Sequence, residues 1–175
     1  MPDKGRMLAV DPGENTGFSI WKDDRLLGGG QIPLWQFAHD LKNALEHDVG
    51  PLEQGESEIL AAGVSPDDNV GKIDVIVCEK FALYPDKAKS LYWDEFRTVQ
   101  LIGAITLLAQ DHDILLHKQP ALIKSRAMAG GAGELFIKPL HENRHQNDSI
   151  MHGWFYRQVE VKGINLKLPD KGKGS

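Results

Sequence analysis

MLAVDPGENTGFSIW, residues 7–21, is the stretch of sequence that decides the fold. It predicts a short apolar strand ending in the carboxylate of Asp11, a tight turn at Pro12-Gly13, and a second strand running back the other way. Gly17 relieves the chain just before the second strand. A carboxylate on the last residue of a buried strand is costly unless a cation meets it, and a divalent metal ion is the usual answer. A surface aspartate opening a hairpin is the simpler alternative, but the whole pattern favours the metal.

Composition describes one ordinary soluble domain. The chain has 175 residues, with 41% hydrophobic and 26% charged residues, and no apolar run of membrane-spanning length. We expect a single domain over residues 1–160 and a basic, flexible tail over 161–175. The N-terminus lacks the apolar stretch of a signal peptide, and Cys78 is the only cysteine, which excludes an internal disulfide and predicts a cytoplasmic protein. Cys78 ends an apolar run, so we interpret it as core packing.

Charge is unevenly distributed along the chain. Residues 1–113 hold 10 Lys/Arg and 20 Asp/Glu, whereas residues 114–175 hold 10 Lys/Arg, 5 Asp/Glu and four of the seven histidines. A basic C-terminal part could cover phosphates while carboxylates elsewhere hold metal, although a lysine-rich tail alone would also produce an imbalance.

Hydrophobic periodicity predicts an α/β fold. We expect three antiparallel strands followed by two parallel ones in a mixed five-stranded sheet, with helices on both faces. The predicted strands are Met7–Asp11, Gly17–Trp21, Leu26–Ile32, Ile73–Glu79 and Asp113–His117. The predicted helices are Leu34–Val49, Ala88–Gln110, Pro120–Ala129 and Glu142–Gln158, and residues 50–72 are interpreted as an excursion.

Two predicted strands end in a carboxylate, Asp11 and Glu79, and these would meet if the strands are neighbours. His145 and Asp148 lie three residues apart, on one face of the last predicted helix. Such a set is what two Mg²⁺ or Mn²⁺ ions need for in-line attack on a phosphodiester. Individually the residues have simpler explanations: Glu79 could pair with a nearby lysine, Lys80 or Lys89, and the helix pair could be solvated.

The chain resembles the RuvC-type Holliday-junction resolvases of the ribonuclease H-like (retroviral integrase) superfamily. Four segments carry the resemblance: Asp11–Gly17, Ile73–Glu79, Val99–Ala104 and His145–Asp148. The resemblance implies a ribonuclease H-like fold in which Asp11, Glu79, His145 and Asp148 are catalytic and hold two Mg²⁺, with Mn²⁺ as a substitute.

The same resemblance implies an endonuclease that cuts four-way or other branched DNA in recombination and repair. Some members have Asp in place of the histidine, the excursion over residues 50–72 is unusually long, and Ser149 replaces a small residue of the family. The compact length and divergent spacing look like the bacteriophage-encoded branch, acting in a bacterial cell or an infected host.

Residues of the basic part are the candidate DNA contacts. We expect four cations to touch backbone phosphates: Lys118, Lys124, Arg126 and Lys138. Phe81 is a candidate for stacking on an unpaired base, or else a core residue.

Symmetric cutting of a junction calls for two equivalent sites, so we expect a homodimer. Apolar residues surround the predicted helix Ala88–Gln110 almost completely, which makes it the candidate interface, with Ile105 as the test position. The alternative is that the sheet and another helix of the same chain cover it.

Three other functions compete with the nuclease. A ribosomal-RNA-processing nuclease of the same superfamily also opens with Asp-x-Gly. Sugar and acetate kinases do as well, but they need a second phosphate loop and a longer chain. A non-catalytic junction-binding protein would have no need of converging carboxylates.

Overall fold

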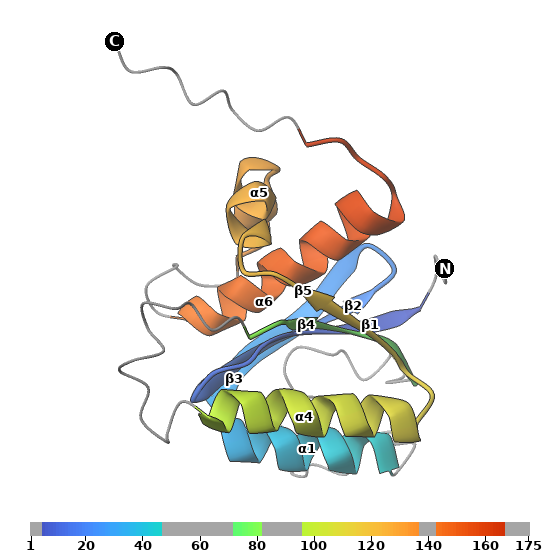
Figure 1. Cartoon of the computed structure of the whole chain (residues 1–175). Helices are drawn as coiled ribbons and strands as arrows, with labels where there is room; N and C mark the ends of the chain where they lie inside the picture. Colours follow the sequence, from blue (N-terminus) through green and yellow to red (C-terminus); the bar gives the residue numbers. More distant parts are fainter. Residues whose placement is uncertain (1–4, 47–71, 82–95, 137–142, 167–175) are drawn as a thin grey trace.

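The computed structural model describes residues 5–46, 72–81, 96–136 and 143–166, and Figure 1 shows the path of the chain. Its strands are β1 (Arg6–Asp11), β2 (Asn15–Lys22), β3 (Arg25–Pro33), β4 (Ile73–Glu79) and β5 (Leu115–Gln119). Its helices are α1 (Leu34–Glu46), α4 (Phe96–Asp111), α5 (Ile123–Ala129) and α6 (Arg144–Phe155), with a short 3₁₀ helix η2 (Ala132–Leu135) and a π-helical turn η3 (Tyr156–Val161). Several predicted features lie outside the described residues. They are residues 50–71 of the excursion, the start of the helix predicted from Ala88 (which includes Lys89), the candidate DNA contact Lys138, and the end of the tail.

The strands form one mixed five-stranded sheet in the order β3-β2-β1-β4-β5. The pairs β1–β2 and β2–β3 are antiparallel, whereas β1–β4 and β4–β5 are parallel. This confirms the predicted sheet. Because Val10 pairs with Cys78, the two strand-end carboxylates follow at the same edge.

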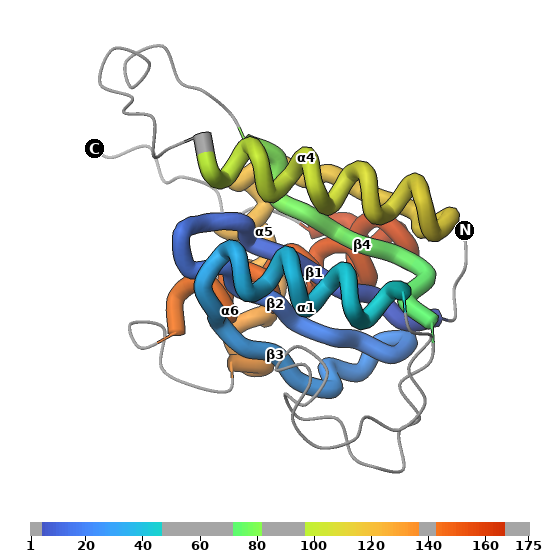
Figure 2. The backbone as a smooth tube through the Cα atoms, turned by 90° about the horizontal axis from the view of Figure 1, so that it is seen from below, coloured from blue at the N-terminus to red at the C-terminus, as the bar shows by residue number. Residues whose placement is uncertain are grey.

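Helices cover both faces of the sheet (Figure 1). α1 and α4 lie side by side on one face, as Figure 2 shows from below, and α6 crosses the other face with α5 beside it. Alternate residues of β1 point to opposite faces of the sheet and pack in a hydrophobic core on each face. Leu8 and Val10 pack with α1 and α4, while Met7 and Ala9 pack on the α6 side. Cys78 is fully buried, as predicted.

Several boundaries differ from the prediction. β5 begins two residues later than expected, because the chain turns at His112 and Asp113, where Asp113 has a positive φ of 54°. Residues Pro120 to Leu122 form a turn, so α5 begins at Ile123. The last helix was predicted to end at Gln158. In the structure α6 ends at Phe155, and the chain continues directly into η3, which extends to Val161.

The choice of Ile105 as an interface position was wrong. Ile105 is 1% exposed and packs in the core that α4 shares with the sheet and α1. On α4, the exposed large apolar residues are Val99 and Leu107, and a Cβ at Gly103 between them would meet nothing within 4 Å. The alternative, in which the sheet and another helix of the same chain cover the apolar residues of this helix, holds for Leu101, Ile102 and Ile105. Within the described parts of the chain, no helix is long and apolar enough to cross a membrane.

Close backbone packing explains Gly17. A Cβ there would lie 1.9 Å from the carbonyl oxygen of His145 and 2.6 Å from the nitrogen of Gln146. The start of α6 thus rests directly on β2, where only glycine leaves room. This contact brings the polar end of α6 to the sheet edge at which β1 and β4 end.

Candidate metal centre

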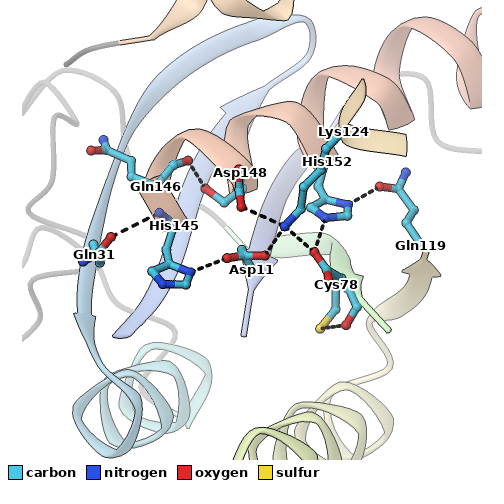
Figure 3. A network of polar contacts seen from close by, with 11 residues as sticks. Asp11, Gln31, Cys78, Gln119, Lys124, His145, Gln146, Asp148 and His152 are labelled. Carbon is cyan, nitrogen blue, oxygen red and sulfur yellow. Dashed lines mark hydrogen bonds and ion pairs between the residues drawn. The ribbon is translucent and has the colours of Figure 1, made fainter. Parts of the chain in front are cut away.

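Three carboxylates from three elements converge on one point. Asp11 ends β1, Glu79 ends the neighbouring parallel strand β4, and Asp148 lies on α6. The ammonium group of Lys124, from α5, stands between them. Its Nζ is 2.8 Å from Asp11 Oδ1, 2.6 Å from Glu79 Oε2 and 2.8 Å from Asp148 Oδ2 (Figure 3). These carboxylates therefore share a single cationic partner.

His145 lies at the edge of this cluster, beside Asp11. Its Nδ1 is 2.6 Å from Asp11 Oδ2, and its backbone N–H donates to Oε1 of Gln31 on β3. The His145 side chain is 37% exposed, whereas Asp11 and Asp148 are buried. The structure thus brings all four sequence-predicted residues together, with the histidine at the rim, and the solvated alternative does not hold for Asp148.

His152 is the residue that sequence reasoning missed. It is fully buried on α6, with Nε2 3.0 Å from Glu79 Oε2 and Nδ1 2.8 Å from Gln119 Oε1 (Figure 3). Ligand atoms of Asp11, Glu79 and His152 all lie within 4.8 Å of one another. The signal was present in the sequence, because His152 follows His145 by seven residues and Asp148 by four, and so shares their helical face.

The pKa values reflect this crowding. Burial raises the pKa of Asp11, although the hydrogen bond from His145 and the charge of Lys124 oppose the rise. Burial also raises the pKa of Glu79, but hydrogen bonds with His152, Asp11 and Lys124 outweigh it and lower that pKa to about 2. Despite burial, the carboxylates raise the pKa of Lys124. The pKa of His145 is raised mainly by its hydrogen bond with Asp11.

The residues present fit a divalent cation. Lys124 is a stand-in ion, because its ammonium group sits where three carboxylate oxygens already point at a positive charge. Carboxylate oxygens suit Mg²⁺ and Mn²⁺, and the two nearby imidazoles add nitrogen ligands, which a transition-metal ion such as Mn²⁺ accepts more readily than Mg²⁺ does. Among the described residues, Glu79 is paired with Lys124 and His152 rather than with Lys80, the first of the two lysines that the simpler alternative named.

The predicted DNA contacts occupy different settings. Lys118 on β5 and Arg126 on α5 are exposed, and Phe81, just past β4, is 42% exposed and so is not the core residue of the alternative interpretation. Lys124 is only 21% exposed and is engaged with the carboxylates. Its contact with phosphate stays a prediction, as do the contacts of the others.

Known proteins support the fold. The sequence matches no protein-family model, and no curated protein matches it significantly. Among solved structures, the chain is similar to Thermus thermophilus RuvC in complex with a Holliday-junction substrate, with a TM-score of 0.58 and 11% identity over 91% of this chain and 96% of that one. A second Thermus thermophilus RuvC structure gives a TM-score of 0.56 and 11% identity over 90% and 96% of the two chains. The chain therefore has the ribonuclease H-like fold of RuvC.

Proposed function

We propose that this chain is a metal-dependent endonuclease that resolves four-way DNA junctions or cuts other branched DNA. One observation carries the proposal: carboxylates from β1, β4 and α6 meet at a single cation position. They do so on the fold of RuvC, a protein whose structure includes a Holliday-junction substrate. We extend the proposal to a role in recombination or repair in the cytoplasm of a bacterial cell or a phage-infected host.

Asp11, Glu79 and Asp148, with His145 beside Asp11, would hold one or two Mg²⁺ or Mn²⁺ ions. Bound ions would polarise the scissile phosphate and supply an activated water. Two residues of the chain keep these carboxylates in position before an ion binds. His145 orients Asp11, and Lys124 balances the carboxylates until an ion arrives. An ion at the same point would exclude the ammonium group, which would then be available to a phosphate.

DNA would approach the sheet edge at which the carboxylates lie. Lys118, Arg126 and the displaced Lys124 would contact backbone phosphates, together with Lys138, and Phe81 would stack on an unpaired base. A second copy of the chain would supply the second cut, and the exposed stripe of Val99 and Leu107 on α4 is the surface we assign to that dimer contact.

Cleavage of a synthetic four-way junction tests the proposal. The full-length chain should cut it with Mg²⁺ or Mn²⁺ and not with chelator, and a linear duplex and an RNA hairpin should be poorer substrates. Asp11→Asn should abolish cleavage but bind the junction as well or better, because removing a carboxylate lowers repulsion of phosphate. Cleavage at the normal rate by that variant would contradict the metal assignment. Preference for the RNA hairpin would favour a ribosomal-RNA nuclease, and binding without any cleavage would favour a non-catalytic junction protein.

A further inference from the structure

His152 belongs to a line of polar contacts that leads away from the centre. On β5, Gln119 pairs directly with Glu79 of β4, and its side chain reaches His152 Nδ1 at 2.8 Å (Figure 3). The other end of the Gln119 amide lies against Glu160 of η3, with Nε2 3.2 Å from Oε1. Glu160 in turn has Oε2 2.6 Å from Nε2 of the partly exposed His117. A fully buried imidazole is thus held from behind by two further residues.

This line fixes the tautomer of His152. A carboxylate only accepts hydrogen bonds, so the amide N–H of Gln119 must face Glu160. The carbonyl oxygen of Gln119 therefore faces His152 and accepts from Nδ1–H. Nε2 is left as the nitrogen directed at Glu79 Oε2, 3.0 Å away. Two lone pairs at that distance repel, so the contact is held either by a proton on Nε2, as in the hydrogen bond to Glu79 described above, or by a metal ion in the place of that proton.

We propose that His152 ligates a divalent ion through Nε2, together with Asp11 and Glu79, and that Gln119 and Glu160 are positioning residues that direct Nε2 toward it. This inference rests on the proposed metal-dependent function and deepens it by naming the ion. Mg²⁺ prefers oxygen ligands, whereas imidazole nitrogen suits transition-metal ions. The centre is therefore built to select Mn²⁺ over Mg²⁺.

Pulsed electron paramagnetic resonance on Mn²⁺ bound to the full chain is the direct test, because nitrogen nuclei of ligating histidines modulate the spin echo. His145 is a second imidazole at the centre, so the decisive sample is His145→Gln. Nitrogen modulation should persist in His145→Gln and disappear when His152→Gln is added. His39→Gln is the matched control, because His39 is an exposed histidine on α1 far along the chain from these residues. It should leave the spectrum unchanged.

Calorimetric titration with Mn²⁺ and with Mg²⁺ gives an independent measure of selectivity. His152→Gln should weaken Mn²⁺ binding by about tenfold or more and Mg²⁺ binding by much less, since an amide oxygen replaces the nitrogen. Gln119→Leu should also weaken Mn²⁺ binding, by about 10- to 100-fold, because Nδ1–H loses its acceptor and the ring can exchange tautomers. Circular dichroism confirms that each variant is folded.

The outcomes separate this inference from the function on which it rests. A His145→Gln protein that shows no nitrogen modulation, or that binds no Mn²⁺, would overturn the role of His152 even if the His152 variant failed to fold. Mn²⁺ and Mg²⁺ affinities that fall equally in His152→Gln would overturn the selectivity. A native chain that binds neither ion would instead contradict the proposed function itself.

Discussion

Gly17→Ala is the substitution that most directly tests how the sequence builds the site. The new Cβ would lie 1.9 Å from the carbonyl oxygen of His145, 2.0 Å from its carbonyl carbon and 2.6 Å from the nitrogen of Gln146. All three are backbone atoms, so no side chain can rotate away. Real Cβ contacts are essentially never shorter than 3.0 Å, and the start of α6 must therefore retreat from β2 by about 1 Å.

Such a shift has two measurable consequences. Overpacking of this kind costs about 1–3 kcal/mol, which lowers the melting temperature of a domain of this size by roughly 2–12 °C. α6 carries His145, Asp148 and His152, and misplacement of reacting groups by about 1 Å can reduce a rate by about 100-fold. The variant should thus melt earlier and, at a temperature where it remains folded, cleave a junction about 100 times more slowly.

Gly133→Ala is the control for this experiment. The Cβ at that position would meet only the flexible end of Met128, at 3.3 Å, and Gly133 lies in η2 without a positive φ. Thermal unfolding by circular dichroism and single-turnover cleavage should both stay near the native values. A Gly17→Ala variant that matched the control in melting temperature and in cleavage rate would refute the role of this backbone contact in positioning α6.

Three further predictions concern charge and assembly. Lys124→Met should tighten binding of Mn²⁺ measured by calorimetry, because the ion no longer displaces an ammonium group held by three carboxylates; unchanged or weaker binding would argue against a shared position. In the metal-free protein, Glu79 has its pKa lowered from 4.5 to about 2, so it stabilises the fold above pH 4.5 and loses that contribution as the pH falls from 4.5 toward 2. The contribution is at most about 3 kcal/mol, and solvent screening of the 20% exposed side chain reduces it. Urea unfolding of the native chain and of Glu79→Gln should therefore give a difference in stability that shrinks as the pH falls from 4.5 toward 2. Leu107→Glu should yield folded monomers in sedimentation if α4 forms the dimer contact, whereas Ile105→Asp should unfold the chain; a folded dimer of the Leu107 variant would exclude this surface.

Local patterns in the sequence were enough for the sheet and for most of the site. The apolar run of β1 and the β-branched run of β4 indicate buried strands, and each ends in its carboxylate, so their parallel pairing alone brings Asp11 and Glu79 together. The spacing of His145 and Asp148 places both on one face of α6. Gly17 was recognised as a special position, but its reason, the contact with the backbone of α6, is a tertiary feature that no local pattern contains.

His152 and the surroundings of Lys124 depend on contacts between distant segments. His152 lies among the apolar residues of α6, where an isolated histidine is indistinguishable from core packing until Glu79 and Gln119 are seen beside it. The position of Lys124 depends on the turn from Pro120 to Leu122, which separates β5 from α5 and leaves the Lys124 ammonium group at the carboxylates that end β1 and β4. From the sequence, Lys124 was predicted to contact DNA phosphates, because nothing in the sequence distinguishes it from the neighbouring exposed cations.

The two roles of Lys124 are linked by charge. Three carboxylates cannot stay this close without a cation, so in the absence of metal the ammonium group is the partner that keeps Asp11, Glu79 and Asp148 facing one another. A divalent ion at that point would satisfy the same oxygens and repel the ammonium group, whose flexible stem would let it move from the centre toward solvent. We therefore expect metal and DNA binding to be coupled through this residue. Metal should increase the affinity of the native chain for a junction more than that of Lys124→Met, measured by fluorescence anisotropy with Ca²⁺ in place of the catalytic ion. An equal increase for the two proteins would show that Lys124 neutralises the carboxylates without passing its charge to DNA.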